Sequence, residues 1–316
     1  MALGLFFMLV AGGLSLLVPA DARQPKSVSF VIKRGEGVRD IAARLKSEGL
    51  IKSPVGFTIY SLITGAATGF KPGKYSLTAM MPAPEIARTL EAGIPAITVR
   101  IQKGMTVVDI DRVLSDAGVT AVGEVAAYAA HADPSLEGFL FPDTYVFSGG
   151  TTAEQAVAEM RAAFDRSIGP VFAGMTEADR YKTLILASLI EKEALYPHDR
   201  LVASGVFQNR LKIGMSLQLD AANVYAKCKG AYMTCPASER ELSRADLKAE
   251  GPYNLYLHQG LPPTPIANPG KDAVVAALHP ARSTNLYYIS NPKTGRLIFA
   301  ETLDGHDENR SKYYIN

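Results

Sequence analysis

The strongest candidate for catalysis is a carboxyl group at the end of an apolar run. Residues 181–194 read YKTLILASLIEKEA, and in the stretch LILASLI only Ser188 is polar. A helix that is apolar on most sides is buried, so Glu191, which follows directly, is expected to have a raised pKa, as a general acid near neutral pH requires. The alternative is that Glu191 ends the buried stretch and turns to solvent. Glu193 is expected on another face, exposed beside a Lys or Arg.

Other kinds of chemistry find little support in the sequence. The five histidines are dispersed, no HExxH or HxH pattern occurs, and there is no GxSxG elbow, Walker loop or dinucleotide fingerprint. We therefore expect no metal and no cofactor. The formal net charge is +2, and Lys and Arg are scattered along the chain. A charge this small and this dispersed argues against nucleic-acid binding.

The elements that must position Glu191 are predicted from apolar periodicity and from turn residues. Two similar strand–turn–helix units are expected over residues 28–49 and 98–119, which indicates an internal repeat. Residues 120–150 and 214–270 are expected to be structured loop, the first with a possible edge strand. Together these elements predict an α+β fold. The expected helices are 83–92, 152–168, 176–195, 199–213 and 272–278, followed by a β-hairpin around Asn291-Pro292-Lys293-Thr294-Gly295.

The beginning of the chain differs from the rest. Residues 1–20 carry no charged side chain and are long enough to span a bilayer as a helix. We expect an uncleaved membrane anchor, with a signal peptide cut near Ala20-Asp21-Ala22 as the alternative. Both imply export, and an oxidising compartment permits a Cys228–Cys235 disulfide. Two free thiols are the other possibility.

Residues 26–97 form a further region of interest. Their strand–turn–helix pattern resembles the LysM-like α/β modules that bind polymers containing N-acetylglucosamine. The same pattern also suits a purely structural unit.

Several long motifs carry a more specific resemblance. LASLIEKEA, ASGVFQNRLKIGMSLQLD and GPYNLYLHQGLPPTPIANPG resemble segments of the MltG (YceG-like) family of endolytic murein transglycosylases, as do EGFLFPDTY, LSRADLK and AALHPA, all in the family's order. The resemblance implies that residues 98–316 are the catalytic domain and that Glu191, the first Glu of I-E-K-E, is the catalytic acid/base. It also implies a single-pass protein of the inner membrane with its catalytic domain in the periplasm.

The resemblance implies a reaction that needs only one carboxyl group, whereas an ordinary glycosidase uses two. A lytic transglycosylase cleaves the bond between N-acetylmuramic acid and N-acetylglucosamine and leaves a 1,6-anhydromuramoyl end without consuming water. The implied partners are nascent glycan strands and the synthases that make them, with the enzyme ending strand elongation.

Neutral polar and aromatic side chains in the same motifs suit a groove for an uncharged polysaccharide. Core packing and turn or helix capping are the alternatives for several of them. The candidate substrate-binding residues are Asn209, Gln218, Asp220, Tyr253, Asn254, Tyr256 and Asn268.

Two other functions remain open. A hydrolytic muramidase would need a second carboxylate to activate water, and Asp220 is the one reasonable candidate. A peptidoglycan-binding scaffold without activity would rest on the LysM-like region.

Overall fold

The computed structural model describes residues 16–33, 35–132 and 135–315. They form an α+β fold of helices and small two-stranded sheets, as predicted. The chain divides into two compact units. The first comprises residues up to Thr98 together with Val146–Thr152, and the second comprises Val99–Tyr145 and Ala153–Asn316.

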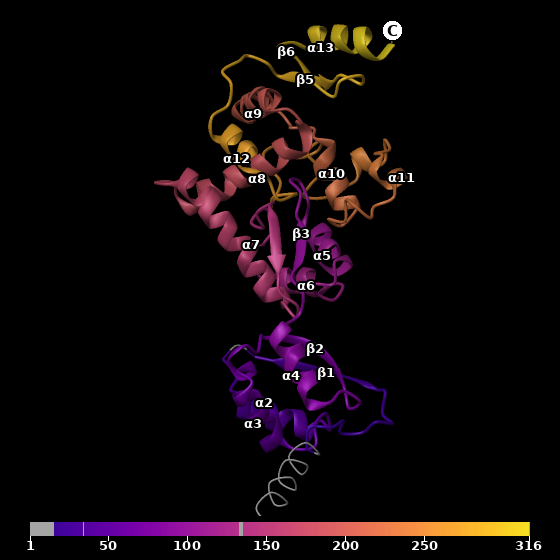
Figure 1. Cartoon of the computed structure of the whole chain (residues 1–316). Coiled ribbons are helices and arrows are strands. Elements are labelled where there is room, and N and C mark those ends of the chain that lie inside the picture. Colours follow the sequence, from indigo (N-terminus) through magenta and orange to yellow (C-terminus); the bar gives the residue numbers. More distant parts are fainter. Residues whose placement is uncertain (1–15, 34, 133–134, 316) are drawn as a thin grey trace, which may run out of the picture. The chain divides into compact units, whose positions relative to one another are not determined.

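The first unit pairs two antiparallel strands and packs helices against them (Figure 1). Its core gathers side chains such as Phe30, Leu45 and Leu77 from both strands and the helices. The helix after residue 53 was not predicted, although Ser53 caps it by accepting a hydrogen bond from the Gly56 N–H. The elements are β1 (Ser27–Ile32), α2 (Val38–Ser47), α3 (Pro54–Ile63), β2 (Gly73–Thr78) and α4 (Ala83–Ala92).

The repeated strand–turn–helix pattern is confirmed as local structure. β1 leads to α2, and β3 (Ile97–Arg100) leads to α5 (Val107–Asp116). Gly35 and Gly104 occupy the two turns with φ of 80° and 79°, a conformation that favours glycine. Thr106 and Asp109 form a reciprocal capping box at the start of α5.

The second unit is mostly helical and holds all of the predicted site residues. Its elements, after β3 and α5, are α6 (Glu124–Ala130), β4 (Thr144–Phe147), α7 (Ala153–Ile168), α8 (Glu177–Glu193), α9 (Pro197–Lys212), α10 (Asp220–Lys227), α11 (Ala237–Arg240), α12 (Lys271–Leu278), β5 (Tyr287–Ser290), β6 (Leu297–Ala300) and α13 (Leu303–Arg310).

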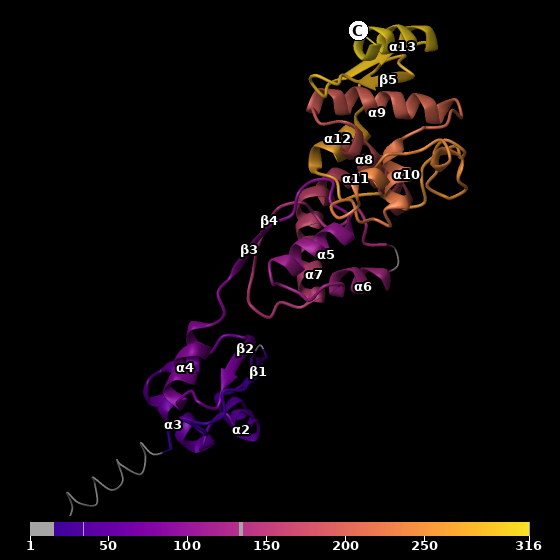
Figure 2. The same cartoon turned by 90° about the vertical axis from the view of Figure 1, so that its right-hand side faces the viewer.

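Helix α8 runs through the core of this unit. Thr176 caps its first turn by accepting from the Asp179 N–H, and every residue from Leu184 to Glu191 is buried. The helix packs against α9 and α12. In both views α9 lies between the α8–α12 pair and the β5–β6 hairpin (Figures 1 and 2). The predicted helices 152–168, 176–195 and 199–213 are thereby confirmed within two or three residues.

The predictions about loops were confirmed only in part. Residues 120–150 contain strand β4, as expected, but also helix α6, and residues 214–270 contain the short helices α10 and α11. These helices are only four to eight residues long. Apolar periodicity cannot be recognised over so few residues, because it needs several turns to repeat.

The predicted membrane segment lies mostly in residues 1–15, outside the described residues. Among the helices that the structure does describe, none is both long enough and apolar enough to cross a membrane.

Candidate active site

Glu191 is enclosed in an ion pair. Its carboxylate accepts a 2.6 Å hydrogen bond from Arg200 on α9, and the Gly270 N–H donates to its other oxygen at 2.9 Å. The side chains of Glu191 and Arg200 are only 4% and 8% exposed. Burial raises the pKa of Glu191, and the Gly270 N–H and the guanidinium oppose that rise.

The surroundings of this pair hold further charges. Arg200 also faces Asp272 at 3.7 Å, and Lys103 bonds to Asp272 at 3.0 Å. Each oxygen of Glu191 accepts one of the two hydrogen bonds and has a second lone pair for a further donor. The structure therefore places Glu191 in a bond that ties α8 to α9 and to the start of α12.

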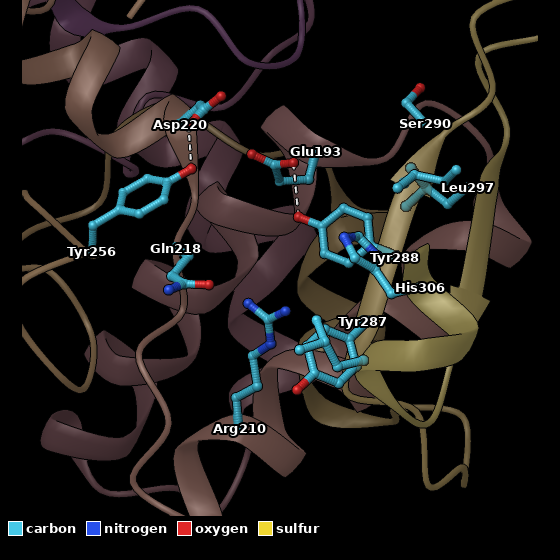
Figure 3. Close-up of a pocket in the computed structure, with 12 residues that line it drawn as sticks. Glu193, Arg210, Gln218, Asp220, Tyr256, Tyr287, Tyr288, Ser290, Leu297 and His306 are labelled. Carbon is cyan, nitrogen blue, oxygen red and sulfur yellow. Dashed lines mark hydrogen bonds between the residues drawn. The ribbon is translucent and has the colours of Figure 1, made fainter. Parts of the chain in front are cut away.

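Glu193 faces a different environment, and the expectation that it is an exposed partner of Lys or Arg was wrong. The Tyr288 hydroxyl donates a 2.9 Å hydrogen bond to its Oε2. Glu193 lines an open pocket of 380 Å³, together with Gln218, Asp220 and Tyr256. Figure 3 shows these side chains directed into one space, with Tyr288 beside the carboxyl group.

The environment of Glu193 also favours its protonated form. Burial raises its pKa, and the negative charge of Asp220 adds to the rise. Hydrogen bonds from Tyr288 and from the Ala221 N–H at the start of α10, and the charge of Lys192, act in the opposite direction. The net effect is a raised pKa, as it is for Glu191.

Three predicted substrate-binding residues meet at this pocket. The Tyr256 hydroxyl donates a 2.6 Å hydrogen bond to Asp220, which begins α10. Gln218 stands just before that helix with a φ of 50°, and its side chain is exposed. Arg210 fixes the opposite wall, because its guanidinium donates to the carbonyls of Leu286 and Leu217.

The other four predicted residues are occupied within the protein. Asn268 is fully buried, and its side chain bonds to Met105, Leu140 and Glu137. The amide of Asn254 donates to two backbone carbonyls of its own loop, and that of Asn209 donates to the carbonyls of residues 283 and 285. Tyr253 bonds to Thr264. For the three asparagines, the alternative of packing and capping fits the structure.

Sequence reasoning missed Glu137, a second buried carboxyl group. It accepts hydrogen bonds from the Val107 N–H at the start of α5, from Asn268 and from the Tyr225 hydroxyl. Burial raises its pKa to about 8. Its position as the first residue of the EGFLFPDTY motif could have identified it. It joins α5, α10 and the loop before α12, away from the lining of the Glu193 pocket.

A signal for Glu193 was also available. At helical spacing it shares a face with Leu189 and Ile190, both fully inaccessible to solvent. The argument from desolvation therefore applied to Glu193 as well as to Glu191. What the sequence could not reveal is that Arg200 would enclose one carboxylate while Tyr288 approached the other.

The disulfide between Cys228 and Cys235 is present, with a Cα–Cα distance of 5.7 Å. It follows α10 and packs beside Val224, Tyr232 and Leu242. Within the described ranges, no group of three or more His, Cys, Asp or Glu residues is arranged to hold a metal ion.

A buried carboxyl group with a raised pKa beside polar side chains is the arrangement of a general-acid site, and the end of α8 carries two such groups, Glu191 and Glu193. The chain belongs to the YceG-like family, whose model matches residues 30–312. It is 30% identical to an endolytic murein transglycosylase of Bacillus subtilis, over 95% of this chain and 89% of that relative.

Two further comparisons agree. An endolytic murein transglycosylase of Streptococcus pneumoniae is 29% identical over 97% of this chain, which spans 63% of the length of that relative. The crystal structure of a yceG-like protein from Listeria monocytogenes superposes with a TM-score of 0.57 at 28% identity, covering 90% of this chain and 99% of that one.

Proposed function

We propose that this chain is an endolytic murein transglycosylase and that Glu191 is its acid/base. The observation that carries the proposal is the buried carboxyl group of Glu191 at the end of α8, which burial gives a raised pKa and which Arg200 and the Gly270 N–H contact. The activity for which the Bacillus subtilis and Streptococcus pneumoniae relatives are named supports the same function.

In the first step, protonated Glu191 gives its proton to the glycosidic oxygen between N-acetylmuramic acid and N-acetylglucosamine. The bond from that oxygen to the muramoyl C1 breaks, and positive charge develops at C1. The resulting Glu191 carboxylate receives hydrogen bonds from Arg200 and the Gly270 N–H, which stabilise its new charge.

In the second step, the carboxylate takes the proton of the muramoyl C6 hydroxyl, and O6 attacks C1 of the same sugar. The product is a 1,6-anhydromuramoyl end, and Glu191 is protonated again. One carboxyl group thus serves as acid and then as base, and water is not consumed. Aromatic faces such as Tyr256 and Tyr287 line the neighbouring pocket and suit sugar stacking.

Glu193 has a positioning role in this proposal. The hydrogen bond that it accepts from Tyr288 ties the last turn of α8, which carries Glu191, to β5. Glu193 also lines the pocket of Gln218, Asp220 and Tyr256, which suits a sugar of the bound strand.

A hydrolytic muramidase is the second candidate function, and the position of Asp220 favours it. Asp220 lines the same pocket as Glu193 and could orient an attacking water. Its bond to the Tyr256 hydroxyl supports a role in positioning instead. A scaffold without activity would leave the raised pKa of Glu191 without a use.

Product analysis on purified glycan strands tests these candidates. Wild type should yield anhydromuramoyl ends, Glu191→Gln should yield none, and Glu193→Gln should still yield them. Reducing muramic ends from wild type would favour the muramidase. Binding without cleavage by wild type would favour the scaffold.

The remaining parts of the proposal concern cellular context. The β1–α2–α3–β2 order of the first unit supports a LysM-like module that binds glycan. The charge-free residues 1–20 support an inner-membrane anchor with a periplasmic catalytic unit. We further propose that cleavage of nascent strands ends their elongation beside the synthases that make them.

A further inference from the structure

The outer face of α3 is unusually apolar for a helix surface that no described residue covers. Val55, Ile59, Leu62 and Ile63 are 64%, 52%, 58% and 81% exposed. Their spacing of i, i+4, i+7 and i+8 places them on one face. The ten residues of α3, PVGFTIYSLI, include no charged side chain.

The opposite face of α3 accounts for the folding of the helix. Phe57 and Ser61 are fully buried against the core of the first unit. The apolar outer residues are therefore not needed to hold α3 in place. Single exposed apolar residues are ordinary, but a contiguous group of large ones marks an interaction surface.

The chain itself indicates what lies against this face. The described chain begins beside α3, because a Cβ added at Gly56 would lie 3.2 Å from the Cβ of Leu16. Leu17 then packs on the same core, and its carbonyl accepts from the Ala83 N–H. The fifteen residues before Leu16 carry no charged side chain. Leu16, which lies beside α3 in space, and Val18 are themselves exposed apolar residues.

We propose that the outer face of α3, formed by Val55, Ile59, Leu62 and Ile63, lies in the interfacial layer of a lipid bilayer. A helix with one apolar face can immerse that face at the boundary between headgroups and acyl chains. A ten-residue helix has too little apolar area to hold a protein there alone. This contact rests on the proposed membrane anchor at residues 1–20. Because that anchor would already hold the first unit at the bilayer, the effective concentration of lipid at the α3 face is high. Lys52, which is exposed just before α3, can reach anionic headgroups.

The sequence provides a direct test, because the chain contains no tryptophan. A single Trp introduced in the full-length protein is then the sole tryptophan signal. We would prepare Ile59→Trp and Ile63→Trp with vesicles of phosphatidylethanolamine and phosphatidylglycerol that contain acyl-brominated phosphatidylcholine. Val31→Trp, an exposed position on β1 of the same unit, is the matched control.

The proposal predicts blue-shifted emission from the two α3 variants, and bromine quenching at least about twofold stronger than for Val31→Trp, in the fraction that floats with the vesicles. In a Leu62→Trp protein, adding Ile59→Asn and Ile63→Asn should weaken the quenching. These positions are exposed, so thermal unfolding should match that of wild type.

Three results would overturn the proposal. Emission like that of Val31→Trp would mean that the face is in water. A blue shift without bromine quenching would mean that protein covers it, either a second copy or another part of this chain. A protein that fails to float with the vesicles would have no stable membrane contact. None of these measurements depends on glycan cleavage.

Discussion

Glu191 and Glu193 stand two positions apart at the end of α8, and their carboxyl groups have different partners. Glu191 accepts from Arg200 at 2.6 Å, and Glu193 accepts from Tyr288 at 2.9 Å. Side chains two positions apart on a helix point in nearly opposite directions. One helix end therefore carries two carboxyl groups with separate partners, and burial raises the pKa of both.

Replacing the proposed acid should remove cleavage. Glu191→Gln keeps the shape of the side chain but has no proton to donate, so we expect strand cleavage by the folded protein to fall by about 10²–10⁴-fold. Release of anhydromuramoyl products measures the loss. Glu177→Gln, an exposed change at the start of α8, is the control and should retain full activity. Full activity in Glu191→Gln would refute the assignment.

The pH dependence of cleavage should move in opposite directions in two variants. The first step needs protonated Glu191, so kcat/KM should fall as pH rises through its raised pKa. The charge of Asp272 raises that pKa and the charge of Lys103 lowers it. Asp272→Asn should therefore shift the alkaline limb to lower pH, and Lys103→Met should shift it to higher pH. Profiles of kcat/KM for both variants test the signs, and a shift in the same direction would contradict the argument.

Replacing Glu191 should also lower stability. Glu191→Gln leaves the buried guanidinium of Arg200 with only its 3.7 Å contact to Asp272, which costs about 3 kcal/mol of unfolding free energy. Urea denaturation should detect this loss. The double variant Glu191→Leu/Arg200→Met should recover much of it, because it removes both buried charges. Neither folded variant should release anhydromuramoyl products, and their release by either one would contradict the assignment.

The buried Glu137 should make the stability of the second unit depend on pH. Burial raises its pKa from 4.5 to about 8. Its contribution to the unfolding free energy is thus fully present below the unfolded pKa and is lost as pH rises through about 8. Wild type should lose a few kcal/mol relative to Glu137→Gln between mildly acidic and mildly alkaline pH. Urea titrations of both proteins across this range measure the difference, and parallel curves would exclude the effect.

The disulfide should stabilise the segment after α10. A loop closed over a sequence separation of 7 is worth about 2.5 kcal/mol by the chain-entropy argument. The Cys228→Ser/Cys235→Ser variant should melt at a lower temperature than wild type, and reductant should lower the melting temperature of wild type alone. An equal response to reductant in both proteins would show that the bond has no role.

The fold could be predicted where apolar periodicity runs over several turns. Helix α7 and the buried helix α8 were recognised in this way, and Gly214 marked the end of α9 with a φ of 69°. Helix α3 was missed because its outer face is apolar too, so the sequence shows little contrast between its two faces. Short α10 and α11 were missed because their boundaries are set by contacts distant in sequence, such as the Tyr256–Asp220 hydrogen bond.

The candidate site was predictable as a set of motifs and only partly as a geometry. Gln218, Asp220 and Tyr256 do line one pocket. The sequence could not distinguish the two carboxyl groups of α8, because their partners Arg200 and Tyr288 come from other elements. It could not separate Asn268 from ligand-facing residues either, since burial of a polar side chain depends on the whole packing around it.

The position of Tyr288 on β5 has a consequence for when the protein becomes active. One wall of the pocket that holds Glu193 comes from the β5–β6 hairpin. This hairpin follows α8, α9 and α10 in the chain and is therefore synthesised after them. A chain still emerging from the ribosome or from a translocation channel lacks that wall. Under the proposed function, cleavage should therefore begin only after the C-terminal hairpin has docked.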